Sequence, residues 1–350
     1  MSQTTASARR ARIRWLLGAA VSIGILVWLI RSIDTTALSR RAASLDPGWL
    51  LLALLVAYVD RALVIVKWQA LVRALTGAVS LRRAARVYMA TMFASLVLPP
   101  YIGNDVLRAV SLGRRQQLIA EIGTSVVVER AFGILTLGAV CLLSLALLLQ
   151  RSAELEHVAG WMLGLVVVAT IAVWLVFSAW GHRVGRRWRG RRGGRWFAIA
   201  DRVNDALAAY RRRPLLLWGF AIASILEQAL VVIFYWLGAK ALDVPAGAAA
   251  MFAAIPLACF MARLPIGIWG MGVMEATVVY LLRFFGITAA DALAIALLGR
   301  LVELGSIIPG AFLLGDLATG GEPRLRKSAR GKAEAAVASE VEQTAGPAGF

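Results

Sequence analysis

The chain has 350 residues, of which 60% are hydrophobic, and it carries a formal net charge of +18 at pH 7. Soluble domains are only about 45–50% apolar, and here the apolar residues form long blocks separated by arginine-rich segments. This arrangement indicates a polytopic membrane protein and excludes a basic nucleic-acid-binding groove. The cysteines and histidines are too few and too scattered for a disulfide framework or a metal centre, so we expect no metal and no cofactor.

Six segments are long and apolar enough to cross a bilayer, which takes roughly 20 residues. The predicted spans are 14–31, 48–67, 118–149, 158–180, 214–238 and 291–316. No small-residue cleavage site follows the first span, so it is predicted to be retained and not removed as a signal peptide. Residues 1–13 are predicted to be a basic cytoplasmic N-terminus, and residues 318–350 a disordered cytoplasmic tail.

Two further segments, 87–112 and 247–284, are apolar but interrupted in the middle. Each is predicted to form a re-entrant hairpin, in which two short helices enter and leave the membrane on the same side. Broken helices at corresponding positions in two halves of a chain point to a transport site near the membrane midplane. The residues that make the breaks are Pro99, Pro100, Gly103 and Asn104 in the first segment, and Pro265, Gly267, Gly270 and Gly272 in the second.

The distribution of arginine predicts the orientation, because cytoplasmic loops are enriched in positive charge. The 182–196 loop contains seven arginines, and its cytoplasmic placement puts both termini inside. Arg40 and Arg41 then fall outside, against the rule. With this orientation the fold class is all-α, with six spanning helices plus two re-entrant hairpins in an inverted repeat. Residues 14–317 form the transmembrane domain, with repeat one at about 14–149 and repeat two at about 158–317.

Several charged residues lie inside these apolar segments, although each costs about 2.5–3.5 kcal/mol at a helix centre. Those beside the breaks are expected to be functional, because broken backbone within a membrane must face protein or a watery cavity. For the Glu129/Arg130 and Arg300/Glu303 pairs, a functional role and simple pairing within the bundle are both open. Asp60 and Arg61 are interpreted as side chains that snorkel to the interface. The candidate head-group-binding residues are Asp105, Arg108, Glu129, Arg130, Glu275, Arg300 and Glu303.

These residues resemble motifs of a known family, the transmembrane-region family of lysylphosphatidylglycerol synthases, which are flippase-like integral membrane proteins. The resemblance covers about residues 10–317. It is carried by Pro100, Gly103, Asp105 and Arg108 in the first half, by Glu129-Arg130 and Lys67-Trp68, and by Leu264, Pro265, Gly267, Gly270, Gly272, Glu275 and Arg300 in the second half.

The resemblance implies movement of a phospholipid between leaflets. Full-length synthases of this group add a soluble aminoacyl-transferase domain, and a tail of about thirty residues is too short for one. We therefore expect no aminoacylation, no catalytic residues and no enzymatic activity.

The leading hypothesis is a multi-pass flippase of the cell inner membrane that moves a phospholipid or lipid-linked head group through a polar cavity between the repeats. Anionic lipids are expected at its cytoplasmic surface. One alternative is a non-transporting membrane partner of a lipid or envelope biosynthetic complex. The other is a transferase for lipid-linked sugars, with Asp105 or Glu129 as general base. The sequence does not indicate whether the protein forms a homo-oligomer.

Overall fold

The computed structural model describes residues 43–77, 79–96, 102–113, 118–150, 156–177, 205–263 and 270–319, with isolated positions 24, 27, 31, 36 and 41 before them. The predictions for span 14–31 (apart from positions 24, 27 and 31), for the 182–196 loop, for the two chain ends and for Pro99, Pro100, Pro265 and Gly267 lie outside these residues. Within them the structure is helical and contains no strand, which confirms the all-α class.

The helices are α3 (Pro47–Thr76), α4 (Leu81–Ala94), α5 (Ile102–Gly113), α6 (Ile119–Leu149), α7 (Glu156–Phe177), α10 (Pro214–Ala241), α11 (Ala248–Met261), α12 (Val273–Leu282), the 3-10 turn η2 (Arg283–Phe285), α13 (Ala289–Ile307) and α14 (Pro309–Thr319). Residues 205–211 are helical as well.

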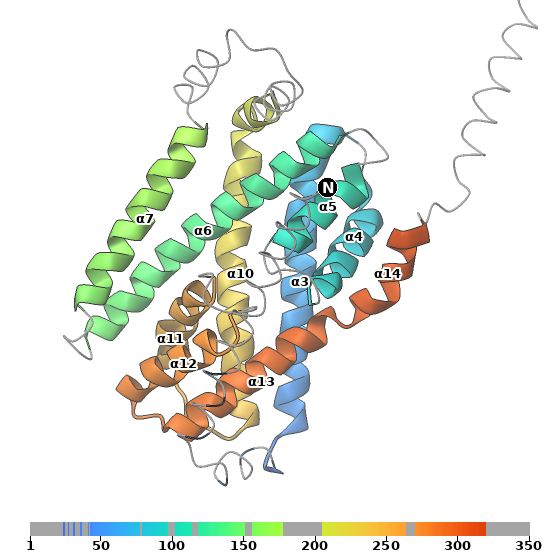
Figure 1. Ribbon diagram of the computed structural model, residues 1–350. Helices are drawn as coiled ribbons and strands as arrows, with labels where there is room; N and C mark the ends of the chain where they lie inside the picture. The colour runs from blue at the N-terminus through green and yellow to red at the C-terminus, as the bar shows by residue number, and fades with distance from the viewer. Residues whose placement is uncertain are drawn as a thin grey trace, which may run out of the picture.

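Four helical stretches in the described ranges are long and apolar enough to cross a membrane: Pro47–Thr76, Ile119–Leu149, Pro214–Ala241 and Ala289–Gly315. They correspond to four of the predicted spans. The predicted span 158–180 coincides with α7, which packs along α6 and is not among these four (Figure 1).

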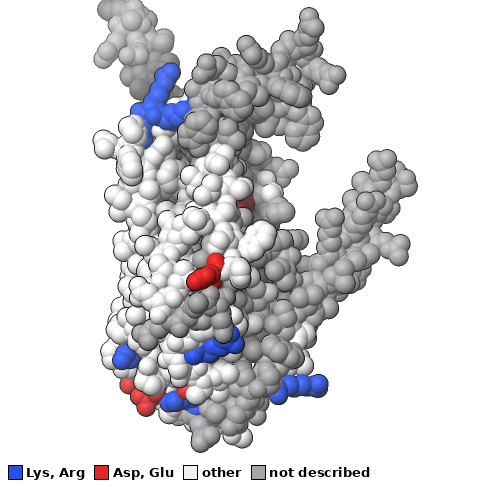
Figure 2. All heavy atoms as spheres, turned by 90° about the vertical axis from the view of Figure 1, so that its left-hand side faces the viewer, with Lys and Arg blue, Asp and Glu red and all other residues white. Residues whose placement is uncertain are grey.

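The outer surface of the bundle is apolar. Leu215 on α10 is 86% exposed and Phe312 on α14 is 84% exposed. Figure 2 shows a side of the molecule whose described surface is mostly uncharged, with acidic atoms near mid-height and Lys and Arg side chains at the top and in the lower third. Such a surface is unfavourable in water and typical of contact with lipid.

The last predicted span, 291–316, corresponds to the candidate span Ala289–Gly315, in which the chain is divided into α13 and α14. The chain turns at Ile308, and α14 begins at Pro309. Proline has no N–H and its ring clashes with the preceding turn, so a continuous helix is broken there. After the break α14 packs against α4 of the first half.

Gly310 makes this contact possible, because a Cβ at that position would lie 2.1 Å from the carbonyl oxygen of Met89. We expect Gly310→Ala to lower the free energy of unfolding by about 1–3 kcal/mol through overpacking against α4. Thermal unfolding in detergent, followed by circular dichroism, measures this. The matched control is Gly219→Ala, where a Cβ meets nothing within 4 Å. The control should be neutral or stabilising, and equal losses in both variants would show that the close approach is not limiting.

The two interrupted segments form two pairs of short helices, as predicted. Helix α5 follows α4 and packs on it, and α12 packs on α11 in the same way. The α4/α5 pair and the α11/α12 pair lie towards opposite ends of the bundle (Figure 1). The prediction that Gly103 and Asn104 belong to the first break was wrong, because α5 already begins at Ile102. Both residues are tolerated in its first turn, where the backbone N–H groups have no helical partner anyway.

Gly270 and Gly272 do lie at the second break, and backbone geometry explains both. Their φ angles are 65° and 82°, in the left-handed region that favours glycine. A Cβ on Gly270 would also lie 2.5 Å from the Cβ of Ala262 at the end of α11. The backbone N–H of Gly272 donates to Glu275 Oε2 at 2.6 Å, so the acid of the second motif caps α12.

Helices α3 and α10 are antiparallel neighbours through the centre of the bundle (Figure 1). The N–H of Asp46, which caps the start of α3, donates to the carbonyl of Ala241 at the end of α10 at 2.8 Å. Towards the other end, the hydroxyl of Tyr210 donates to the carbonyl of Leu71 at 2.9 Å. Each of the two helices thus directly precedes the interrupted segment of its half of the chain, and they run in opposite directions.

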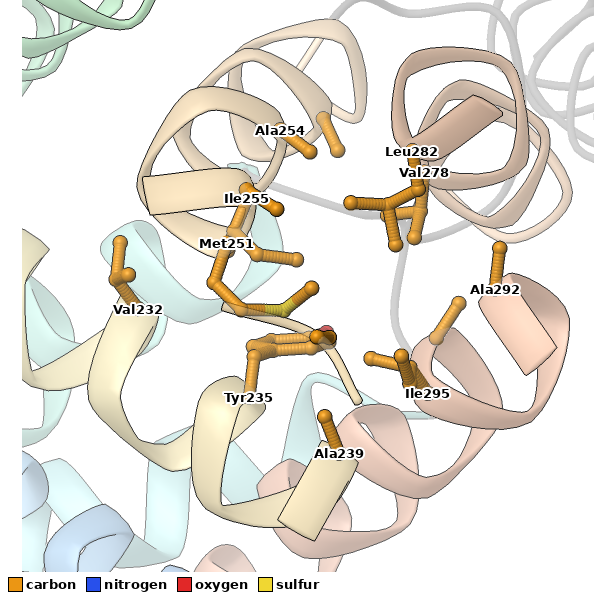
Figure 3. Close-up of a cluster of buried hydrophobic side chains, with 14 of the residues drawn as sticks. Val232, Tyr235, Ala239, Met251, Ala254, Ile255, Val278, Leu282, Ala292 and Ile295 are labelled. Carbon is orange, nitrogen blue, oxygen red and sulfur yellow. The ribbon is translucent and has the colours of Figure 1, made fainter. Parts of the chain in front are cut away.

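The largest apolar core joins α10, α11, α12 and α13. Figure 3 shows Tyr235, Met251, Val278 and Ile295 converging from these four helices. Pro256 lies inside α11 and cannot donate to the carbonyl of Phe252, four residues earlier. The hydroxyl of Ser144 on α6 donates to that carbonyl instead, at 2.7 Å. A sequence feature that would weaken an isolated helix is therefore compensated by its neighbour in the bundle.

Arg41 has a structural role that accounts for its unexpected position. Its Nε donates to Asp291 Oδ1 at 2.7 Å, and its Nη1 donates to the carbonyl of Asp243 at 2.9 Å. Arg41 therefore lies at the same end of the molecule as the 239–246 connection. A cation that ties three segments together at one end of the bundle need not follow the charge rule for loops.

Candidate functional site

The first charged cluster consists of Tyr88, Asp105, Arg108, Glu129 and Arg130, from helices α4, α5 and α6. Arg108 donates through Nη1 to Glu129 Oε2 at 2.7 Å and through Nη2 to Asp105 Oδ1 at 2.8 Å. Arg130 binds Asp105 in a bidentate manner, through Nε at 2.9 Å and Nη2 at 2.7 Å. The hydroxyl of Tyr88 donates to the other oxygen of Glu129 at 3.3 Å. Two carboxylates and two guanidinium groups thus form one neutral network.

Arg108 is the buried centre of this cluster, with 0% of its surface exposed. Its guanidinium carbon lies 4.6 Å from the ring centre of Tyr88 and 5.2 Å from that of Trp68, so aromatic faces cover it. Because both terminal nitrogens donate to carboxylates, only Nε has no partner among the described residues. Arg108 can therefore hold the cluster together but presents no free pair of donors.

Exposure rises from the centre of the cluster to its edge. The side chain of Asp105 is 21% exposed and that of Arg130 is 45% exposed. Asp105 lies in the first turn of α5, where the helix dipole favours a negative charge. The Asp105–Arg130 pair is thus the accessible part of the first charged cluster, beside the break between α4 and α5.

The second charged cluster consists of Asp60, Arg61, Glu275, Arg300 and Glu303, from α3, α12 and α13. Arg300 lies 3.4 Å from Glu275 through Nε and 3.4 Å from Glu303 through Nη1. Arg61 lies 3.2 Å from Asp60 and 3.9 Å from Glu303, both through Nη2. The cluster therefore joins the capping residue of α12 to the middle of α3.

The interpretation of Asp60 and Arg61 as interfacial snorkelling residues was wrong. Asp60 is only 1% exposed, and Arg61 reaches Met92 Sδ of α4 at 3.7 Å. Both lie near the middle of the 30-residue α3, because this helix continues past the predicted end of the span to Thr76. The apolar run that ends at Lys67 did not mark the end of the helix, so their central position in α3 was missed.

A third pair, Lys67 and Glu227, bridges α3 and α10. Lys67 Nζ forms a salt bridge with Glu227, donates to Ser224 Oγ at 3.1 Å and lies 5.0 Å from the ring centre of Phe220. From the sequence, Lys67 was named only as part of a family motif, and neither Lys67 nor Glu227 was placed in the site. The signal available was position: Glu227 follows Pro214 by 13 residues, and Asp60 follows Pro47 by the same 13.

The pairing pattern settles which of the neighbouring charges interact. Asp105 with Arg108, and Arg300 with Glu303, pair three residues apart as their spacing predicts. Glu129 and Arg130 hold different partners, since consecutive residues on a helix point in different directions. The acid after each break pairs with an arginine 25 residues later, Asp105 with Arg130 and Glu275 with Arg300. Both halves of the chain therefore build the same contact.

This geometry coincides with a family assignment. Residues 15–310 match the family described as the lysylphosphatidylglycerol synthase TM region, and the matched stretch contains all three charged groups. The chain belongs to this family. Comparison with curated proteins found no match.

As a member of the lysylphosphatidylglycerol synthase TM region family, the chain is a multi-pass membrane protein. Its long apolar helices and lipid-facing surface agree with that assignment. In the ranges that the structure describes, no group of three or more His, Cys, Asp or Glu side chains is arranged to hold a metal ion. The polar chemistry that the described helices do offer consists of paired carboxylates and cations enclosed by apolar helices.

Proposed function

We propose that this protein is a lipid flippase or transporter, which moves a phospholipid or lipid-linked head group between leaflets of the cell inner membrane. The observation that carries the proposal is the accessible Asp105–Arg130 pair, placed at a helix break inside an apolar bundle. An intramembrane ionisable residue is a functional candidate by default, most of all where it is accessible. The family assignment supports the same reading, and both termini are proposed to be cytoplasmic.

The repeat gives this site a means of opening to both sides. The order of long helix, two short helices and long helix recurs as α3–α6 and as α10–α13. Their first helices are antiparallel, and the two short-helix pairs lie towards opposite ends (Figure 1). We infer an inverted-topology repeat with α4/α5 and α11/α12 as re-entrant hairpins. Such repeats allow a central site to face one side and then the other.

In the proposed cycle, the phosphate of a lipid competes with Asp105 for Arg130. Arginine presents planar donors that fit a phosphate in a bidentate manner, as they fit the carboxylate here. Arg108 would keep Asp105 in place when Arg130 turns to the phosphate. The lipid tails stay in the bilayer, because only the head group needs a polar path. In the second half, Arg300 and Glu303 would hold the head group after it passes.

The test is a leaflet-exchange assay with the purified protein in liposomes that contain a trace of fluorescent phospholipid. We expect Arg130→Gln to slow exchange about ten-fold or more, because it removes a charge-assisted contact of about 1.5–3 kcal/mol. The matched control is Arg82→Gln, an exposed arginine on α4 outside the three charged groups. A folded Arg130→Gln protein that exchanges lipid at the unmodified rate would refute this site.

A second candidate function is a non-transporting partner of a membrane biosynthetic complex. It is favoured by the neutrality of the first charged cluster, whose members are satisfied by one another without any ligand. In that case the unmodified protein shows no exchange in the same liposomes. The charged residues would then matter only for stability, and Arg130→Gln would leave the recovery of copurified proteins unchanged.

A further inference from the structure

The second charged cluster carries one negative charge too many. It contains three carboxylates, those of Asp60, Glu275 and Glu303, but only two guanidinium groups, those of Arg61 and Arg300. The first charged cluster contains two of each, and the Lys67–Glu227 pair is neutral. An uncompensated charge at membrane depth is costly, so the cluster requires one more positive charge.

Asp60 is the carboxyl group at which that charge is missing. It is 1% exposed, and its Oδ1 has no hydrogen-bond partner among the described residues. Its Oδ2 lies 3.2 Å from Nη2 of Arg61. The same nitrogen of Arg61 lies 3.9 Å from Glu303 on α13, which also pairs with Arg300. Glu275, by contrast, has both oxygens occupied, one by the N–H of Gly272 and one by Arg300. Asp60 Oδ1 is a buried acceptor that no group donates to, which is costly. A proton bound to this oxygen would neutralise Asp60 and cancel the surplus negative charge of the cluster.

The groups that face Asp60 from neighbouring helices do not supply this charge. Lys67 on α3 is held by Glu227 and Ser224 of α10, and Glu227 adds a negative charge within reach of Asp60. Glu303 on α13 adds another, and Cys259 on α11 carries none as a thiol. On the side of α4 and α6, Tyr88 and Glu129 are bound in the first charged cluster. Arg263, just after α11, lies near Cys259 and donates to the carbonyl of Gly133 on α6. Arg61 is therefore the one nearby cation of this set that is not committed outside the second charged cluster.

We propose that Asp60 is a proton-binding site, at which one proton taken from water neutralises the second charged cluster. The proton adds to the free Oδ1 and returns to water when it leaves, so no other reactant is needed. With Asp60 neutral, Arg61 is released to pair with Glu303, which draws α3 and α13 together at this point. With Asp60 ionised, Arg61 is shared again between the two carboxylates. Proton occupancy thereby biases the contact between the two halves of the chain.

Infrared spectroscopy of the purified protein in lipid nanodiscs tests this directly, because a protonated carboxyl group and a carboxylate absorb at different frequencies. We expect a protonated-carboxyl band near neutral pH that disappears at alkaline pH. Asp60→Asn should remove this band, whereas Asp205→Asn, a control at an exposed position, should leave it unchanged. A band that persists in folded Asp60→Asn protein overturns the assignment.

A second variant separates surplus charge from burial alone. Glu303→Gln leaves two carboxylates against two guanidinium groups, so Asp60 should stay ionised and the band should vanish although Asp60 is still present. Retention of the band in this variant refutes the argument from charge balance. Should Asp60→Asn fail to fold, the unmodified protein labelled with 13C-aspartate shows whether the band belongs to an aspartate, and Glu303→Gln then ties that aspartate to the second charged cluster. The frequency of the protonated-carboxyl band must then fall, because the label is in the carboxyl group. An unshifted band assigns the proton to a residue other than aspartate and overturns the proposal.

The same spectra distinguish a bound metal cation from a proton. If added sodium ions abolish the band near neutral pH, sodium takes the place of the proton and the proposal is wrong. The inference does not depend on the proposed lipid transport. A protein that shows no leaflet exchange but has the Asp60 band retains the proton site, whereas exchange without the band leaves the transport function and removes this site.

Discussion

Replacing Arg108 by methionine is expected to lower the free energy of unfolding by about 3–5 kcal/mol, the range for breaking a buried salt bridge from one side. Arg108 is completely buried and donates to both Asp105 and Glu129. Methionine has a similar length and fills much of the space between Trp68 and Tyr88. The loss therefore reports mainly the unpaired carboxylate of Glu129, whose remaining donor is the hydroxyl of Tyr88.

The double variant Arg108→Met/Glu129→Leu provides the control. It removes the cation together with the acid that depends on it and leaves the Asp105–Arg130 pair neutral. We expect it to recover a large part of the loss, because an apolar replacement of a whole buried pair is often neutral or stabilising. Equilibrium unfolding in mixed micelles gives the free energy of unfolding of the unmodified protein, of Arg108→Met, of Glu129→Leu and of the double variant. If the two single losses simply add in the double variant, Arg108 and Glu129 do not form the pair that the structure shows.

The sequence revealed where two apolar segments are interrupted and which charged residues interrupt the apolar runs. Hydrophobic length located α6 and α10 nearly to their ends, and proline with glycine located both short-helix pairs. These features are local, since each depends on a few consecutive residues. The resemblance to the family was confirmed, over residues 15–310.

What the sequence could not reveal were the partners of each charge. Glu129 and Arg130 are consecutive, yet one binds Arg108 and the other binds Asp105. Those choices depend on how α5 docks on α6, which is a property of tertiary packing. Asp60 was misplaced for a related reason: hydropathy ended the span at Lys67, but Glu227 of α10 neutralises Lys67 and lets α3 continue. A lysine at the end of an apolar run signals a membrane boundary only when no acid from another helix pairs with it.

The two halves of the chain share a contact but use it in different environments. Asp105 binds Arg130 and Glu275 binds Arg300, each across 25 residues. In the first half the arginine side chain is 45% exposed, and in the second it is 10% exposed. If the halves exchange roles during transport, the exposed pair marks the side that is open in this conformation. The buried pair marks the side that is closed.

This difference predicts unequal costs for equivalent substitutions. Arg300→Met should lower the free energy of unfolding by about 3–5 kcal/mol, because Glu275 and Glu303 keep only the distant Arg61 as a cation. Arg130→Met should cost about 1 kcal/mol or less, because its ion pair is half exposed and Arg108 still holds Asp105. Unfolding of both variants in the same mixed micelles gives the comparison. Equal costs would mean that burial does not distinguish the pairs. Suppose that Arg130→Met is stable but no longer exchanges lipid, and that Arg300→Met is unstable. The exposed Asp105–Arg130 pair would then bind the lipid, and the buried Glu275–Arg300 pair would hold its side of the protein closed.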